Sequence, residues 1–378
     1  MSKKISFNIP FLSGKEKAYV KEAIESRHIS GDGAFTQKCQ NYFEKKYGFK
    51  KTFLTTSCTD ALEMTAILMD IKPDDEIILP SFTFVSTANA FLLRGAKLIF
   101  IDSQSDQPNI DVSQIEENIT GKTKAIIIMH YAGISCDMNA ICKIVQQHNL
   151  FLVEDAALGL DSYYENKPLG SFGNFATFSF HETKNISCGE GGLLVVNDEK
   201  FIKRAEIIRE KGTNRSAFFR GEIDKYSWTD IGSSFLPSDL LAAYLWAQLE
   251  SLKIIQSKRI EYWNFYFKKL SRLNKKKKIT LPKCNANSKH NASIFYVVCK
   301  SSEDRTALIN ELKEKGIQTS FHYQALHINN LQSHQHQSSL INSEIFSDCL
   351  LRLPLYVDLK KGEINYVAKA ILDFYRNE

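Results

Sequence analysis

Hydrophobic and polar positions alternate in a regular way through the first half of the chain. Short runs rich in Ile, Val, Leu and Phe predict strands at 51–56, 75–80, 96–102, 124–131, 150–157, 174–180 and 191–198. Between the first five runs, apolar residues recur at helical spacing, which predicts helices at 58–70, 85–95, 111–119 and 137–149. Short apolar strands between helices are typical of a mostly parallel sheet covered by helices on both faces. The sequence therefore predicts an α/β fold with its functional groups at the carboxyl ends of the strands.

The pattern changes toward both ends of the chain. Two helices are predicted before the first strand, at 14–26 and 35–48. A long helical stretch at 239–273 is followed by a strand at 293–300 and by helices at 303–316 and 364–377. We place a boundary near residue 250, so that residues 1–250 form a large domain and residues 251–378 a smaller α+β domain.

Composition and charge narrow the class of protein. Hydrophobic residues make up 43% of the 378 residues and charged residues 24%, as in ordinary globular proteins. The net charge of +5 suits an anionic small substrate, although a solvated surface explains it equally well. The basic run 275–278 has no interleaved aromatic residues. We therefore predict no nucleic-acid partner.

The cysteines and the apolar runs indicate in which cellular compartment the protein is expected. None of the eight cysteines forms a C-x-x-C pair, and His334 and His336 in the polar segment 332–339 have no evident third ligand, so no metal site is predicted. The segment 1–14 has no apolar signal core, and no apolar run is long enough to span a bilayer. We expect a reduced, cytoplasmic protein without membrane insertion.

One lysine lies in an unusual setting. Lys184 stands in "FSFHETKNISCGEGG", with Phe178 and Phe180 before it and a Gly-rich turn at 189–192 after it. A lysine held in a pocket has a lowered pKa and attacks carbonyl groups. A solvated loop lysine without a chemical role fits this stretch alone equally well.

Two further stretches place polar groups at strand ends. In "TTSCTDALEM", a predicted helix begins at Cys58 and Thr59, where free backbone N–H groups would bind an anion such as phosphate. Plain N-capping by Ser57 or Thr59 also explains this stretch. In "LFLVEDAALG", Glu154 and Asp155 end a buried strand, where a carboxylate needs a partner. A cofactor's ring nitrogen, a metal ion or a structural ion pair would each provide one.

An aromatic residue completes the set. "PSFTFVST" brings Phe82 and Phe84 to another strand end, where one ring would stack on a flat cofactor, although core packing explains either ring alone. A phosphate site, a buried carboxylate, an aromatic ring and a pocket lysine are together the parts of a pyridoxal phosphate enzyme. Each signal is weak alone, and the ordered set favours this chemistry.

The same motifs carry a resemblance to a known family. "TTSCTDALEM", "LPSFTFVSTANAFLLRGAKLIFID", "HYAG", "VEDAA" and "FSFHETKN…GEGG" resemble the sugar-nucleotide aminotransferases of the DegT/DnrJ/StrS type, and the resemblance covers nearly the whole chain. It implies a fold type I pyridoxal 5′-phosphate enzyme that forms a homodimer, with each site completed by the partner chain. Within the family, "ISGDGAFTQKCQ", "FHETKN" and "FHYQALH" look most like enzymes that use L-glutamate to aminate a dTDP-linked keto-sugar.

The resemblance implies roles for single residues. Lys184 would carry the cofactor and transfer protons, and Asp155 would pair with the pyridinium nitrogen. The phosphate would be held by Ser179, Cys58 and Thr59, and Phe84 would stack on the ring. For the nucleotide sugar we expect one or two cations from a set that includes Arg215 and Arg220, together with the small-domain residues His322, Tyr323 and His327. The other cations of that set are Arg209, Lys211 and Lys225.

Two positions depart from the family pattern. Leu158 replaces the Gln or His expected near the cofactor's phenolic oxygen, and Leu236 replaces an Asn expected to reach the neighbouring subunit's phosphate, which leaves Ser233 or Ser234 for that contact. Three other functions stay open: an aminotransferase for another keto-sugar, a sugar dehydratase, and a silent member of the fold. The presence of Lys184 counts against the dehydratase, because related dehydratases carry histidine there.

Overall fold

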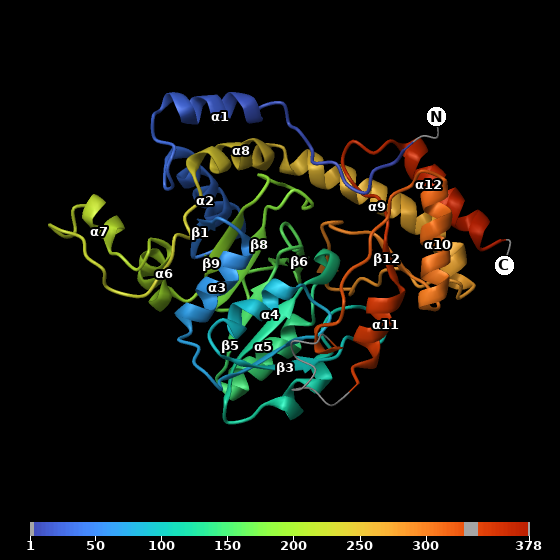
Figure 1. Cartoon of the computed structure of the whole chain (residues 1–378), viewed down its shortest axis with the longest axis horizontal. Helices are drawn as coiled ribbons and strands as arrows, with labels where there is room; N and C mark the ends of the chain where they lie inside the picture. Colours follow the sequence, from blue (N-terminus) through green and yellow to red (C-terminus); the bar gives the residue numbers. More distant parts are fainter. Residues whose placement is uncertain (1–3, 329–338, 377–378) are drawn as a thin grey trace.

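The computed structural model describes residues 4–328 and 339–376, so His334 and His336 lie outside the described residues. A seven-stranded sheet forms the centre of the molecule, in the order β1-β9-β8-β5-β4-β2-β3 (Figure 1). All of its strands run parallel except β9, which is antiparallel to both neighbours. The strands are β1 (Lys51–Thr55), β2 (Glu76–Pro80), β3 (Lys97–Ile101), β4 (Thr123–Met129), β5 (Phe151–Asp155), β8 (Phe175–Ser179) and β9 (Gly192–Val196). The expected mostly parallel sheet is confirmed.

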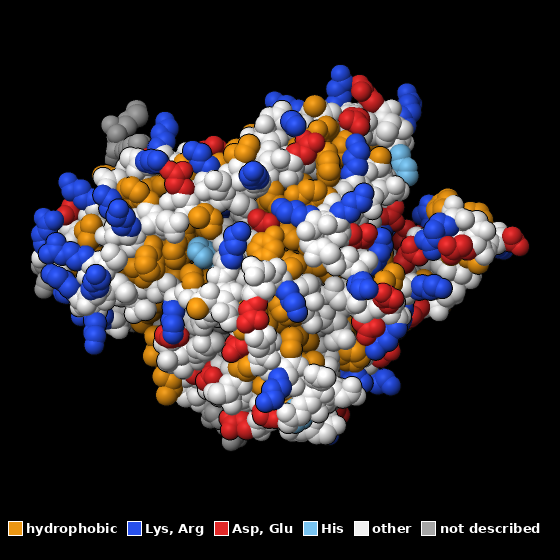
Figure 2. Space-filling model, turned by 180° about the vertical axis from the view of Figure 1, so that it is seen from behind, with side chains coloured by type: hydrophobic (Ala, Val, Ile, Leu, Met, Phe, Trp, Pro, Cys, Tyr) orange, Lys and Arg blue, Asp and Glu red, His pale blue; other side chains and the backbone are white. Residues whose placement is uncertain are grey.

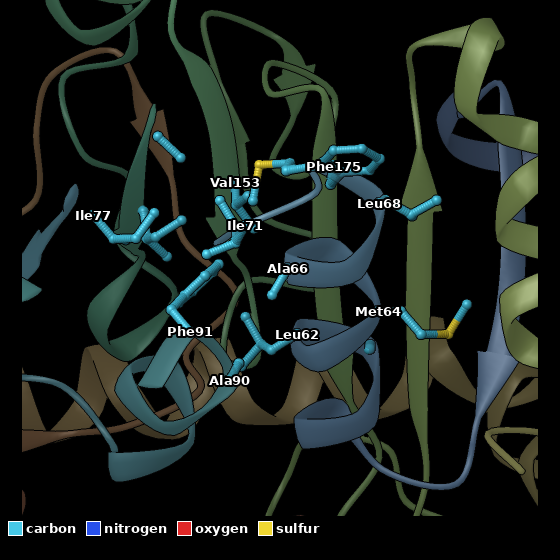
Figure 3. Close-up of a cluster of buried hydrophobic side chains, with 14 of the residues drawn as sticks. Leu62, Met64, Ala66, Leu68, Ile71, Ile77, Ala90, Phe91, Val153 and Phe175 are labelled. Carbon is cyan, nitrogen blue, oxygen red and sulfur yellow. The ribbon is translucent and has the colours of Figure 1, made fainter. Parts of the chain in front are cut away.

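Helices cover both faces of this sheet, because successive strand residues point to opposite sides. Val153 packs in a cluster with α3 and α4, which Figure 3 shows, whereas the preceding Leu152 packs with α5 on the other face. Phe53 and Leu54 of β1 divide in the same way, and Leu54 meets α2 and α8. The helices of this part of the chain are α1 (Glu16–Glu25), α2 (Ala34–Tyr47), α3 (Cys58–Leu68), α4 (Val85–Leu92), α5 (Met138–His148), α6 (Ile202–Arg209) and α8 (Asp239–Glu250). The short α7 (Arg215–Phe219) lies away from the sheet (Figure 1).

Two of the predicted helices differ in the structure. The segment 111–119 forms two 3₁₀ turns, Val112–Gln114 and Glu116–Asn118, because the Asp111 side chain accepts from Ser113 N–H and closes a tight turn. The stretch 239–273 is two helices, α8 and α9 (Leu252–Lys275), which meet at Ser251. Two short pairings outside the main sheet were not predicted: β6 (Tyr163–Tyr164) lies between β7 (Lys167–Pro168) and β10 (Ser288–Lys289).

A second hydrophobic cluster lies in the C-terminal part of the chain. It joins the later turns of α9 to the strand pair β11 (Tyr296–Val298) and β12 (Leu350–Arg352), to α10 (Ser302–Glu314) and to α12 (Lys361–Phe374). α11 (Ile341–Cys349) leads into β12, and Ile5, far away in sequence, also packs in this cluster. We keep the division near residue 250 as a proposal. None of the described helices is long and apolar enough to cross a membrane.

Candidate active site

A cavity of about 640 Å³ opens where β5 and β8 end and α3 and α4 begin. Carboxyl ends of parallel strands are where α/β sheets place their ligands. Eight of the predicted site residues line this cavity: Cys58, Thr59, Phe84, Asp155, Ser179, Lys184, His322 and Tyr323. The fold thus brings together groups that lie far apart in the sequence.

The two acids at the end of β5 have different roles because they point to opposite sides of the strand. Glu154 faces away from the cavity and is fully buried. Its carboxylate accepts from the backbone N–H groups of Gly170, Phe172 and Gly173 at 2.7–2.8 Å and contacts His130 Nε2 at 3.1 Å. Glu154 therefore fastens the 170–173 turn, and the carboxylate available for chemistry is Asp155.

Asp155 lines the cavity and is held by two donors. Thr87 Oγ1 donates to Oδ2 at 2.6 Å, and Ala157 N–H donates to Oδ1 at 3.1 Å. Burial raises the pKa of Asp155 above its usual value, and these two hydrogen bonds oppose that rise because they favour the ionised form. A positive ring nitrogen in the cavity would favour ionisation further.

Lys184 lies at the wall of the same cavity. Among the described residues its amino group has neither a hydrogen bond nor an ion pair, so it is not an ordinary surface lysine. Burial lowers the pKa of Lys184; Cys58 and Asp155 oppose this effect, and the positive charge of Arg352 adds to it. A lysine with a lowered pKa is a better nucleophile because more of its amine is neutral.

The amino end of α3 forms one end of the cavity. The Ser57 side chain caps the helix by accepting from Asp60 N–H at 3.0 Å, while Thr59 Oγ1 donates to Ser86 Oγ at 2.7 Å. A methyl group at Gly192 would lie 2.3 Å from the Ser57 carbonyl oxygen, so only glycine lets β9 approach this helix end. The capping prediction for Ser57 is confirmed, and the first turn still offers backbone N–H groups to an anion.

Aromatic rings form another wall of the cavity. The Phe84 side chain is 54% exposed and lies beside Tyr323, whereas Phe82 is fully buried against Tyr131 and Tyr323. Of the two phenylalanines considered, Phe84 is therefore available to a ligand. Leu158 also lines the cavity, so this part of the wall is apolar.

His322 and Tyr323 stack on each other, with ring centroids 4.1 Å apart. Both nitrogens of His322 are directed into the protein: Nε2 accepts from Arg352 Nη1, and Nδ1 lies 3.5 Å from the Tyr131 hydroxyl. Burial, together with Arg352 and Lys184, lowers the pKa of His322 well below its usual value. The histidine is therefore a neutral ring at the cavity wall.

The structure places three predicted substrate residues outside this cavity. His327 is buried, with Nδ1 at 2.7 Å from Ser81 Oγ and Nε2 at 3.1 Å from Glu344. Arg220 is paired with Glu206 and Glu222, and Arg215 lies over the Phe219 ring. Arg215 begins α7 and Arg220 directly follows its last residue. Both lie in an arm formed by residues 211–234, which projects away from the sheet (Figure 1). Leu236, which stands where the family pattern has an Asn, packs close to Gly31.

Sequence reasoning missed two residues around the cavity. Thr87, in the first turn of α4, holds Asp155, and Arg352, at the end of β12, holds His322. A hydroxyl residue after an aromatic strand end was the only signal for Thr87. For Arg352 the sequence carried none, because its neighbours come from remote parts of the chain.

A lysine and a buried carboxylate in one cavity, at the strand ends of a mixed seven-stranded sheet, fit an enzyme that binds pyridoxal phosphate. The family model described as "DegT/DnrJ/EryC1/StrS aminotransferase family" matches residues 11–372, and the chain belongs to that family. Pyridoxal 5′-phosphate is its cofactor.

The similar proteins cover nearly the whole chain. The chain is 31% identical to GDP-perosamine synthase from Escherichia coli O157:H7, over 98% of each chain, and 30% identical to GDP-perosamine synthase from Caulobacter vibrioides, over 97% of each. Among solved structures it resembles the aminotransferase TlmJ from Streptoalloteichus hindustanus, with 26% identity, a TM-score of 0.91 and coverage of 99% and 100% of the two chains.

Proposed function

We propose that this aminotransferase moves the amino group of L-glutamate to the C4 ketone of dTDP-4-dehydro-6-deoxy-D-glucose, in the cytoplasm. The product would be dTDP-4-amino-4,6-dideoxy-D-galactose, a precursor for surface polysaccharide such as enterobacterial common antigen or O-antigen. This makes the chain a dTDP-4-amino-4,6-dideoxygalactose transaminase. The observation that carries the chemistry is the amine of Lys184, which no described residue pairs, in one cavity with the buried carboxylate of Asp155.

The residues around the cavity fit the cofactor. The first turn of α3, with Cys58 and Thr59, and the Ser179 hydroxyl would hold its phosphate, because free N–H groups at a helix start favour an anion. Asp155 would face the ring nitrogen and keep it protonated. Phe84 would stack on the ring. The bound cofactor supplies an electron sink for the carbanion that forms when the donor loses its α-proton.

Lys184 would do the proton chemistry. Its amine is the group that would hold the cofactor at rest, and it would be free for proton transfer once the donor is bound. The free Nζ then accepts the proton of the donor's α-carbon, and in the second half of the reaction it delivers a proton to C4 of the sugar. Its lowered pKa supports this role, because Nζ must be neutral to accept a proton.

The nucleotide diphosphate needs cations that this cavity does not contain in the described chain, apart from Lys184. Arg215 and Arg220 would reach the cavity of a second copy if the arm crossed a dimer interface. The arm exposes large apolar side chains, including Phe219 at 68% and Trp228 at 78%, and Figure 2 shows hydrophobic surface on this projection. Since monomers rarely expose such groups together, we propose a homodimer.

A GDP-linked sugar is the second candidate substrate, because relatives that match the chain end to end are GDP-perosamine synthases. The test is to give the purified holoenzyme L-glutamate with either the dTDP-linked or the GDP-linked 4-dehydro-6-deoxy sugar. We expect kcat/KM to favour the dTDP-sugar by about 100-fold, the scale of discrimination that one pocket supplies. A preference for the GDP-sugar would overturn the nucleotide assignment and keep the aminotransferase.

Proton NMR of the product tests the position and orientation of the new amine. A small coupling between H3 and H4 means an axial C4 amine and supports the galacto product. A large coupling would identify the gluco epimer. An amine at C3 would identify an aminotransferase for another keto-sugar. Loss of the sugar's C3 hydroxyl without amination would identify a dehydratase.

A further inference from the structure

Two guanidinium groups lie next to the active-site cavity, that of the buried Arg259 and that of the half-buried Arg352, and no described carboxylate forms an ion pair with either. Arg259 of α9 donates only to backbone oxygens, those of Ala292, Leu355 and Ser293 at 2.7–3.1 Å. Arg352 of β12 donates to His322, and its Nε has no partner among the described residues. Buried charges in proteins are normally paired, so two uncompensated cations need an explanation.

Both arginines line one small enclosed space. This second cavity, of about 10 Å³, has walls from Arg259, Arg352, Ser293 and Thr183, and Phe7 and Asn8 also line it. The Phe7 ring lies 4.7 Å from the Arg352 guanidinium, and Asn8 Nδ2 donates to the Glu182 carbonyl oxygen at 3.2 Å. Thr183 precedes Lys184 and lines the large cavity as well, so the small cavity adjoins the active site.

The charge of Arg352 acts on both Arg259 and Lys184. Burial and the charge of Arg352 lower the pKa of Arg259 to about 9, and the same arginine contributes to the lowered pKa of Lys184. A negative charge between the two guanidinium groups would relieve their repulsion. It would also reduce the effect of Arg352 on Lys184.

We propose that the cavity between Arg259 and Arg352 binds a compact inorganic anion of the size of chloride. The space is among the smallest that admit a single particle, so a monatomic anion fits it better than a larger oxyanion. The unused N–H groups of both guanidinium groups provide charged donors for such an ion. The site lies behind the wall of the active-site cavity and is independent of which sugar the enzyme uses.

The direct test uses crystals of the wild-type holoenzyme soaked in sodium bromide. We expect an anomalous peak in contact with both guanidinium groups. A water alone, a carboxylate of a partner chain, or the carboxylate of soaked glutarate at this position would each overturn the proposal. Because this measurement needs no turnover, its failure would leave the proposed transamination untouched, and inactivity toward the sugar would leave the anion site untouched.

A solution test uses thermal unfolding at constant sodium concentration. Chloride should raise the Tm of the wild type by about 2 °C relative to gluconate, because an ion that binds the folded state stabilises it. R352Q should lose this difference. R305Q is the matched control: Arg305 of α10 donates to one carbonyl and its Nε has no partner in the described part of the chain, but it lies outside both cavities. An equal chloride effect in wild type and R352Q would contradict the proposal.

Discussion

The hydrogen bond from Thr87 to Asp155 offers a sharp test of the proposed role of that carboxylate. Thr87→Val keeps the shape of the side chain and removes the 2.6 Å donor to Oδ2. A buried hydrogen bond to an ionised group contributes about 1.5–3 kcal/mol. Since one pKa unit corresponds to about 1.4 kcal/mol, the pKa of Asp155 should rise by roughly 1–2 units.

The sign of the effect on activity follows from the state that catalysis needs. In the proposed mechanism ionised Asp155 would pair with the protonated ring nitrogen, so the acidic limb of kcat/KM should report the protonation of this site. Removing a donor to the carboxylate favours its neutral form, and the acidic limb of T87V should move to higher pH by at least about one unit. The assay is the rate at which L-glutamate converts the cofactor's absorbance, measured across the pH range.

A second threonine–aspartate pair provides the control. Thr36 Oγ1 donates to Asp239 Oδ1 at 2.7 Å in the interior, and neither residue lines the active-site cavity. Both T36V and T87V should lower the stability of the protein, but T36V should leave the pH profile of activity unchanged. If the acidic limb of T87V moves by less than about 0.3 unit, ionisation of Asp155 does not limit activity and the assignment fails.

Three further variants test other parts of the site. Lys184→Ala should abolish both turnover and the absorbance of the lysine–cofactor bond; normal turnover would remove Lys184 from the mechanism. Glu154→Gln turns an amide N–H₂ toward backbone donors of the 170–173 turn and should cost about 3 kcal/mol of stability in urea unfolding, while an unchanged midpoint would contradict the fastening role. Gly192→Ala should lower cofactor affinity at least about 10-fold, because the new Cβ would clash with the Ser57 carbonyl. The control is Gly121→Ala, where a Cβ meets open space. Equal cofactor affinities of the two variants in a titration would refute this reasoning.

The sheet and most helices could be predicted because their signals are local. Each apolar run that was predicted as a strand of the main sheet is one, since burial on two faces requires continuous hydrophobic residues. Two helix predictions were wrong for local reasons. Asp111 closes a tight turn where the helical spacing alone predicted a helix, and Ser251 separates α8 from α9 inside an otherwise continuous helical pattern.

The candidate site divides along similar lines. Lys184 and Asp155 could be proposed from the sequence because an unusual residue at a strand end is visible there. Glu154 could not be separated from Asp155, since only the orientation of each side chain in the folded sheet tells them apart. Arg352 needed the structure, because it reaches His322 only after β12 has formed. The placement of Arg215 and Arg220 likewise depends on how the arm leaves α6.

The pairing of Ile5 with Ile317 has a consequence for how the protein is made. Ile5 N–H donates to the Gly316 carbonyl, and its own carbonyl accepts from Gln318 N–H, each at 2.9 Å. During translation Ile5 therefore emerges long before its partners exist. Phe7 and Asn8, which close the space beside Thr183, can settle only after residues 316–318 and Arg352 have been synthesised. The neighbourhood of Lys184 is thus completed late, by a segment that is synthesised well before Lys184 itself.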